Sequence, residues 1–483
     1  MKFKFASDFI KERFGKVTYK DLLLVINSLT KKFLRDNNFK YDEYHVTTFP
    51  YTFRIGNENH LISTDISLNL IELHNLEFSY YLESRDGRKG GFYLYGLTII
   101  TAMDDNEIEL FEKNKKNHST NILGISFLDF LCSYFNSENE FYLFLQNIFQ
   151  NKINNLLRSE DNWKENRENN IKNLKNSINN PENSFSLFLG AGVSQSIGLP
   201  NWNNLISNLL SNFLLKNTIK TDNIEENIQI ISSLFQSRNM SSALLSARYL
   251  KQAFKMDDNK SIGFLKEIHD ILYKDKQAKS KLIDSIIQLI KSLKNLDSII
   301  TYNFDDIIEQ FLKSERIHHT CIDSGTLRPI KGYLPIYHVH GLIAENNFNS
   351  KNNIIFSEES YHNVYNEPYN WSNLTQLNKL NSNTCIMIGL SLEDPNIRRL
   401  FDIANKNLTS PQHFAFLSRF NQNKLFTNTE YQENLSQDLS TLSNDFLIKH
   451  HKIQEEIFND LGINIIWYEN RNEVYEIINN IIS

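Results

Sequence analysis

Cysteine is scarce in this chain of 483 residues, which contains only Cys132, Cys321 and Cys385 and no CxxC pair. This count excludes a disulfide framework and a zinc site of four cysteines. No apolar run approaches the length of a bilayer-spanning helix. The segment Met1–Phe14 carries charges too close together for the core of a signal peptide. We therefore expect a cytoplasmic protein that does not associate with membranes.

A large excess of charge of either sign is also missing. The formal net charge is −6, with 22% charged and 41% hydrophobic residues, as in ordinary globular proteins. This balance is unfavourable for a dedicated nucleic-acid binder, although a local basic patch stays open. The length leaves room for two or three domains, each with its own core.

Residues 1–150 predict a small α/β domain. Thr18 and Asp21 form a capping-box pattern ahead of apolar residues at helical spacing. A further helix is expected over Phe127–Phe149. Nothing in this part has the spacing of a catalytic set.

A hairpin is expected within the same part of the chain. Apolar alternation over Leu76–Leu82 predicts one strand, Arg85–Gly91 predicts a turn, and Phe92–Ile100 predicts the second strand. The three basic side chains of the turn could contact an anionic partner, or they could form a solvated hairpin tip.

Residues 151–183, rich in Asn, Lys and Glu, predict an exposed helical linker. A second domain is expected over residues 184–483, with mostly helical patterns over Trp202–Lys294 and Glu473–Ile482. Its expected strands are Phe185–Leu189, Ser298–Thr301, Pro335–Val339, Thr384–Gly389, His413–Leu417 and Ile463–Tyr468. Strands that alternate with helices imply an α/β fold, with a parallel sheet covered on both faces.

The segment Phe185–Trp202 is the most informative of the chain. The glycines of the turn Gly190–Gly192, directly after the expected strand, allow the backbone to approach a ligand closely. Ser194 and the residues after it could open a helix whose N-terminal amides attract a phosphate. Gln195 occupies the third-glycine position of GxGxxG, so an ordinary dehydrogenase fingerprint is a poor match.

A second motif, Ser298–Glu309, places Asn303, Asp305 and Asp306 directly after an expected strand. Polar residues at the carboxyl edge of a parallel sheet lie where ligands bind in such folds. Alternatively, Asp305 or Asp306 merely caps the following helix.

A third motif, Tyr337–Gly341, would place His338 and His340 on one face if the strand persists. A metal pair is conceivable, but no third ligand with suitable spacing is evident, and packed, hydrogen-bonded histidines are the alternative. The pairs His318–His319 and His450–His451 fit surface positions and receive no role.

The fourth motif is Ile386–Phe401. A buried strand ends at Gly389, the polar Ser391 follows, and Asp394-Pro395 starts a helix. This turn is suited to hold a ribose or an adenine edge. An ordinary strand-to-helix loop is the alternative.

In this order, the four motifs resemble the catalytic domain of the sirtuins, most closely the sirtuin-like NAD hydrolases of bacterial anti-phage defence. The resemblance covers roughly residues 185–483. It implies a Rossmann-like parallel sheet, here with a long helical insertion before Ser298, and NAD⁺ as substrate. Protein-deacylating sirtuins carry a four-cysteine zinc module, which this sequence cannot make. We therefore expect no zinc, and attack by water rather than deacylation.

The resemblance also implies residue roles. Asn303 would hold the nicotinamide ribose or the attacking water, and His340 would be the base that acts on a ribose hydroxyl. Asp305 would contact the carboxamide. The other cofactor-binding residues implied are Gly190, Ala191, Gly192 and Ser194 at the phosphates and Gly389 and Ser391 at the adenosine ribose.

The expected activity is hydrolysis of NAD⁺ to nicotinamide and ADP-ribose by an effector that depletes NAD⁺ in abortive infection. Such an enzyme needs control, so we expect a homo-oligomer, a regulatory partner protein bound through the N-terminal domain, or both. An NAD-dependent deacylase or ADP-ribosyltransferase is one alternative. A nucleotide-sensing module without turnover is another.

Overall fold

The computed structural model describes residues 2–15, 17–46, 49–55, 60–64, 73, 77, 96–115, 120–158, 161–217, 230, 243–256, 261–348, 353–367, 369–405, 411–425 and 437–482. The chain divides into two compact units. The N-terminal unit is centred on Met1–Ser159, and the C-terminal unit comprises Glu160–Lys406 and Ser410–Ser483. Within the described residues, no helix combines the length and the apolar character needed to cross a bilayer.

The N-terminal unit is built on a five-stranded mixed sheet in the order β1-β2-β3-β4-β5. The first two pairings are antiparallel and the last two are parallel. Its strands are β1 (Tyr41–Val46), β2 (Phe49–Ile55), β3 (His60–Thr64), β4 (Gly96–Ile100) and β5 (Thr120–Leu123). Its helices are α1 (Lys4–Phe14), α2 (Tyr19–Asp36), α4 (Asp105–Asn114), α5 (Ile125–Ser133) and α6 (Glu138–Arg158).

The N-cap of α2 predicted at Thr18 is confirmed. Thr18 Oγ1 accepts a hydrogen bond from the backbone N–H of Asp21 at 3.2 Å, which satisfies a donor of the first helical turn. The single helix predicted over Phe127–Phe149 is wrong, because the chain breaks between α5 and α6. Ser137 Oγ accepts from the backbone N–H of Glu140 and so caps a new helix, α6.

Most of the predicted hairpin lies outside the described residues. The turn Arg85–Gly91 and all of Leu76–Leu82 except Glu77 lie outside the described residues. Of the second expected strand, Phe92–Ile100, the described part is β4.

The C-terminal unit contains a seven-stranded sheet in the order β12-β11-β10-β6-β7-β9-β8, with every pairing parallel. The predicted α/β class with a Rossmann-like parallel sheet is confirmed. The strands are β6 (Phe185–Leu189), β7 (Leu296–Thr301), β8 (His319–Ile322), β9 (Leu334–His338), β10 (Thr384–Ile388), β11 (His413–Ser418) and β12 (Ile463–Tyr468). Sequence patterning missed β8, because in this edge strand Ile322 alone is fully buried.

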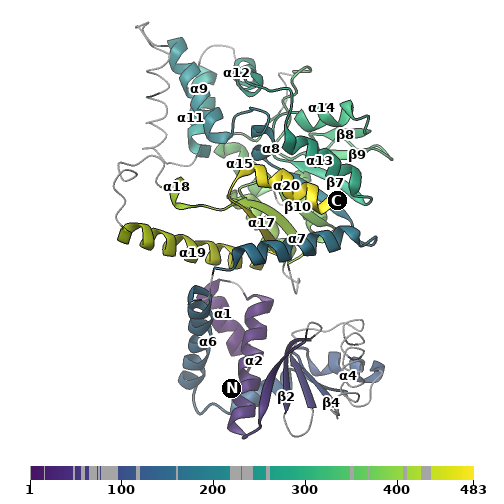
Figure 1. The fold of residues 1–483 in the computed structure, drawn as a ribbon, viewed down its shortest axis with the longest axis vertical. Helices are drawn as coiled ribbons and strands as arrows, with labels where there is room; N and C mark the ends of the chain where they lie inside the picture. Colours follow the sequence, from purple (N-terminus) through teal and green to yellow (C-terminus); the bar gives the residue numbers. More distant parts are fainter. Residues whose placement is uncertain are drawn as a thin grey trace. The chain divides into compact units, whose positions relative to one another are not determined.

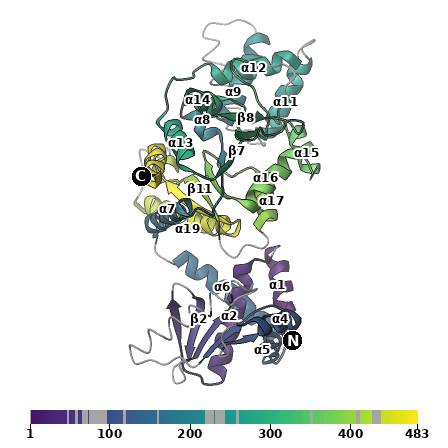
Figure 2. The ribbon, with the colours of Figure 1, turned by 90° about the vertical axis from the view of Figure 1, so that its right-hand side faces the viewer.

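Helices cover both faces of this sheet, as Figure 2 shows for α13 on one side and α16 and α17 on the other. Alternate side chains of β6 divide between the faces: Leu187 and Leu189 join one core, and Phe188 joins the other. The first core is covered by α7 (Trp163–Asn179), α13 (Lys281–Ser292), α14 (Ile307–Ser314) and α20 (Arg471–Ile482). The second is covered by α16 (Trp371–Ser382), α17 (Pro395–Ala404) and α19 (Gln437–Asp460).

Helix α7 belongs to the C-terminal unit, although it lies in the stretch 151–183 that we expected to be an exposed linker. Its residues Trp163, Ile171 and Leu174 are buried, and the helix packs against β12 and α20. The Asn- and Lys-rich composition therefore describes only the outer face of the helix.

The expected helical insertion lies between β6 and β7. Its described helices before α13 are α9 (Trp202–Asn217), α11 (Ala243–Met256) and α12 (Ser261–Tyr273), which pack together at one end of the unit (Figure 1). Their shared core includes Phe304 and Ile343, which belong to the segments after β7 and β9. The insertion therefore supports the same edge of the sheet at which the polar motifs end.

Candidate functional site

A cavity of about 1040 Å³ opens at the carboxyl edge of the seven-stranded sheet, among the segments that follow β6, β7, β9 and β10. Two short helices contribute to its lining, α8 (Ala191–Gln195) and α15 (Glu358–Asn366), whereas α18 (Gln422–Leu425) does not. The expected site residues that line the cavity are Gly190, Ala191, Gly192, Asn303, His340, Gly389 and Ser391. Ser194 and Asp305, also expected to contact the ligand, are not among its lining residues.

The glycine turn and the segment after β10 touch through their backbones. The N–H of Gly192 donates to the carbonyl oxygen of Gly389 at 2.9 Å. A Cβ on Gly192 would lie 2.8 Å from the Cα of Gly389, and a Cβ on Gly389 would lie 2.6 Å from the backbone nitrogen of Val193. Gly389 also has a φ of +72°, which disfavours any side chain. Only glycine fits both positions.

Asn303 follows β7 and is 8% exposed. Its Nδ2 donates to the carbonyl oxygen of Gly190 at 3.1 Å and to Ser194 Oγ at 2.9 Å. These two bonds use both amide protons, so Oδ1 is the atom left to accept a hydrogen bond from a ligand or a water. The residue therefore presents an acceptor beside the glycine turn.

Asp305 lies behind this amide, buried against the hydroxyl of Ser194. Its Oδ1 accepts from the backbone N–H of Ile307 at 3.2 Å, an Asx turn that leads into α14 and not a side-chain N-cap. Burial raises the pKa of Asp305 to about 6, opposed by the hydrogen bond from Ser194. Asp306 is the second candidate cap, but its side chain instead accepts from Tyr273 Oη and Gln310 Nε2.

His340 lies between two aromatic rings at the cavity wall. Its ring centroid is 5.1 Å from that of Tyr302 and 5.4 Å from that of Tyr361, both edge-on. Tyr361 Oη donates to the Asp394 carboxylate at 3.3 Å. Burial lowers the pKa of His340, and the negative charge of Asp394 opposes that effect. The imidazole is therefore neutral at pH 7 and able to accept a proton.

His338 does not share the surroundings of His340, so the idea of a metal pair on one strand face is wrong. Strand β9 ends at His338, and the chain turns at Gly341, whose N–H donates to the carbonyl oxygen of His338. His338 is instead fully buried beside Glu309 and Cys321. The nearby Glu309 carboxylate raises the pKa of His338 well above its usual value, although burial opposes this.

Glu309, Cys321 and His338 also form a group of potential metal ligands that sequence spacing did not reveal. Among the described residues, this is the set of three whose ligand atoms could surround one ion, all lying within 4.8 Å of one another. Helix α14, β8 and β9 each supply one member. The sequence search missed them because ligands from three separate elements leave no spacing pattern.

Basic side chains line another part of the cavity. They are Lys279 and Lys281 at the start of α13 and Arg471 at the start of α20. Lys281 Nζ lies 5.4 Å from the ring centroid of Tyr475, which also lines the cavity. Positive charge here favours a ligand with anionic groups. Sequence reasoning missed these residues, because only the packing of α13 against α20 brings them together.

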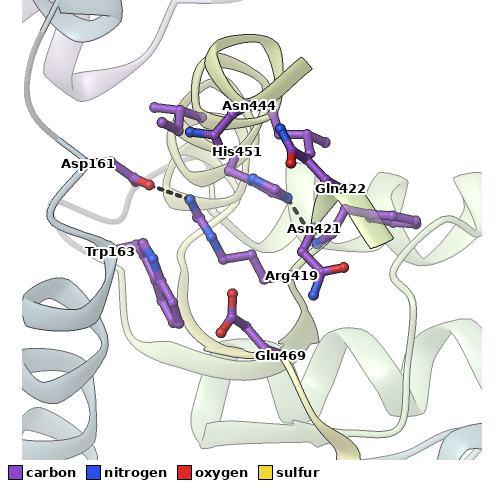
Figure 3. A pocket seen from close by; sticks show the side chains of 11 residues that line it. Asp161, Trp163, Arg419, Asn421, Gln422, Asn444, His451 and Glu469 are labelled. Atoms are coloured by element: carbon purple, nitrogen blue, oxygen red, sulfur yellow. Dashed lines mark hydrogen bonds and ion pairs between the residues drawn. The ribbon is translucent and has the colours of Figure 1, made fainter. Parts of the chain in front are cut away.

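A second cavity, of about 300 Å³, lies elsewhere in the C-terminal unit and contains none of the expected site residues (Figure 3). Arg419 donates to the Asp161 carboxylate at 2.7 Å, and its guanidinium lies 4.8 Å from the ring centroid of Trp163. These contacts fix the segment before α7 to the end of β11.

His451, in the same cavity, corrects the surface position expected for the pair His450–His451. It is 1% exposed, and its Nε2 accepts from the backbone N–H of Phe420 at 3.2 Å. Burial lowers the pKa of His451 to about 4. This histidine is therefore a neutral, packed side chain.

The comparison with protein families agrees with this geometry. Residues 297–441 match the SIR2-like domain. The matched range contains Asn303, His340 and Gly389, and the glycine turn precedes it. The match supports a sirtuin-like family and is consistent with an NAD-dependent enzyme. No curated protein matches the chain.

Proposed function

We propose that the chain hydrolyses the nicotinamide–ribose bond of NAD⁺, releasing nicotinamide and ADP-ribose. One observation carries the proposal: Asn303 and His340 line the same cavity as the glycine turn. The first presents an amide oxygen, and the second an imidazole that burial keeps neutral. A module that only sensed the nucleotide would need neither.

The cavity fits a dinucleotide in size and charge. A volume of about 1040 Å³ lies at the upper end of ordinary ligand sites, and a dinucleotide is a large ligand. The glycine turn allows close approach of a pyrophosphate, and Lys279, Lys281 and Arg471 supply positive charge. Gly389 and Ser391 would then contact the adenosine ribose, and Ala191 the phosphates. Ser194 and Asp305 would act from behind Asn303, by holding its amide.

The chemistry needs few groups. Nicotinamide leaves as a neutral molecule from a cationic ring, so no acid has to protonate it. The ribose passes through an oxocarbenium-like state, as in glycoside cleavage generally, and water forms the new bond at the same carbon. Asn303 Oδ1 would accept a hydrogen bond from that water and orient it. His340 would take a proton from a ribose hydroxyl as the cation develops and return it once the new bond has formed, and the proton lost by the attacking water would pass to solvent.

The test is nicotinamide release, followed by chromatography after purified protein is incubated with NAD⁺. We expect Asn303→Ala and His340→Ala each to lower the rate by about 10²- to 10⁴-fold, the usual cost of losing such a group. Asn444→Ala and His450→Ala are matched controls, because both residues are exposed and lie outside this cavity. Retained ADP-ribose binding shows that a variant is folded. Wild-type rates in either cavity variant contradict the assignment.

The same incubation separates the other reactions of such a pocket. If the chain were a deacylase, an acyl-peptide added with NAD⁺ would yield O-acyl-ADP-ribose. If it were an ADP-ribosyltransferase, the incubation would yield ADP-ribosylated protein. We expect neither product. Attack by water fits a chain whose three cysteines cannot form a four-cysteine zinc module.

We further propose that the activity depletes NAD⁺ in anti-phage defence and is restrained until infection. The N-terminal unit would be the regulatory domain, and the C-terminal unit, which includes α7 as well as residues 184–483, would be the catalytic domain. Support comes from the toxicity of NAD⁺ loss and from the sirtuin-like match. Infected cells carrying the chain should lose NAD⁺, whereas cells carrying Asn303→Ala should keep it. Equal NAD⁺ in both would contradict this role.

A further inference from the structure

A buried pair of charged side chains, Glu309 and His338, lies directly behind Asn303 and has no part in the chemistry above. His338 Nδ1 lies 3.3 Å from the backbone carbonyl oxygen of Asn303, and Nε2 lies 2.5 Å from Glu309 Oε1. The side chain of His338 is 0% exposed and that of Glu309 is 12% exposed. Both ring nitrogens therefore face acceptors, and a doubly protonated imidazole donates to each.

The bond from His338 completes a set that restrains nearly every polar group of Asn303. The N–H of Asn303 donates to Thr301 Oγ1 at 3.1 Å, and its carbonyl accepts from His338. Its side-chain amide donates to Gly190 and Ser194. The one polar atom not used in these bonds is Oδ1, the atom that the proposed mechanism requires.

The position of the pair in the sheet explains why it can hold this residue. Strands β7 and β9 are neighbours, and Thr301 pairs with His338 in their parallel register. The chain leaves β7 at Thr301, so Asn303 lies just beyond the last paired residue, where no strand bond fixes its carbonyl. The imidazole of His338 bonds that carbonyl, and Glu309, from α14, fixes the imidazole.

We propose that Glu309 and His338 are positioning residues, which hold the backbone of Asn303 so that Oδ1 points at the attacking water. The inference rests on the proposed function of Asn303. A buried ion pair is seldom more stabilising than apolar residues of similar size. Two leucines in place of Glu309 and His338 would therefore stabilise the fold about as well. We infer that the contribution of the pair is to fix the position of the Asn303 backbone.

The deciding variant replaces both charges at once. In Glu309→Leu/His338→Leu no buried charge is left alone, so we expect stability to be kept. The bond to the Asn303 carbonyl is lost. We expect kcat for nicotinamide release to fall by about 10²-fold, the cost of a displacement near 1 Å, while KM and ADP-ribose affinity stay close to wild type. If the double variant instead keeps the wild-type kcat, the pair has only a structural role and the inference is wrong.

A second double variant tests the same bond by rescue. In Glu309→Gln/His338→Asn the Asn amide nitrogen takes the place of Nδ1 and can donate to the Asn303 carbonyl without any charge. We expect kcat within a few-fold of wild type, because the geometry and not the charge is needed. If this variant is as slow as the leucine pair, the positioning role is refuted.

Cys321→Ser is the matched control, since it removes the thiol of the third potential metal ligand and keeps a small polar side chain beside His338. We expect unchanged kcat and no bound metal by elemental analysis. Stoichiometric metal in the wild type, lost with activity in Cys321→Ser, would show a metal centre and overturn the inference. Wild-type protein without turnover, both when purified and in extracts of infected cells, would defeat the proposed function itself. Active wild type with an equally active leucine pair would defeat this inference alone.

Discussion

Replacing Asp305 by Asn tests the carboxyl buried behind the glycine turn. Burial raises the pKa of Asp305 from 3.8 to about 6, so the folded chain keeps a proton that the unfolded chain releases between these pH values. The stabilisation by the neutral carboxyl is therefore complete below pH 3.8 and is lost as the pH rises through 6. A rise from 3.8 to about 6 corresponds to roughly 3 kcal/mol.

Asparagine keeps the shape of the side chain and an oxygen that can accept from Ile307, but it cannot ionise. We therefore expect the wild type to lose stability relative to Asp305→Asn as the pH rises, with most of the roughly 3 kcal/mol lost between pH 4 and pH 7. The comparison of the two proteins at each pH cancels the titration of the groups that do not interact with Asp305.

Tryptophan fluorescence during urea unfolding measures this effect in the right part of the molecule. All four tryptophans, Trp163, Trp202, Trp371 and Trp467, belong to the C-terminal unit. The signal is therefore insensitive to unfolding of the N-terminal unit. A stability difference that does not change with pH, or one that grows in favour of the wild type at high pH, would refute the argument from burial.

Two further predictions concern the cavity. In Asp394→Asn the carboxylate that raises the pKa of His340 is gone while a helix-capping side chain remains, so the acid limb of kcat/KM should move to lower pH. An unmoved limb, or one at higher pH, would show that Asp394 does not act on His340. Gly389→Ala should abolish ADP-ribose binding, because its Cβ would lie 2.6 Å from the nitrogen of Val193. Gly332 also has a positive φ, of +84°, but open space around it, so Gly332→Ala should cost only about 1–2 kcal/mol with binding intact. If both variants bind ADP-ribose equally, backbone contact at Gly389 is not required.

The arrangement of the cavity lining could be predicted where it follows from strand order. Apolar runs indicated six of the seven strands, and parallel strands bring their carboxyl ends to one edge. Gly190, Asn303, His340 and Gly389 all follow such strands and all line the cavity. The edge strand β8 was not predicted, because its sequence has no apolar alternation.

Contributions that depend on helix packing could not be predicted. Tyr361 reaches His340 from α15, and Arg471 enters the cavity from α20. The spacing of residues in these two helices does not predict either contact. The direction of the chain after β7 could not be predicted either. Asn303 and Asp305 are both polar residues beyond the same strand, yet Asn303 lines the cavity and Asp305 lies behind it.

The interlocked glycines of the two turns restrict how this chain can change. A methyl group added at Gly192 or at Gly389 would clash with the main chain of the opposite turn. Because the opposing atoms are backbone and not side chain, no smaller residue on the other turn could make room for it. The usual evolutionary route of compensating substitutions is closed here. Any variant library that spares residues 192 and 389 should therefore keep far more functional members than one that randomises either.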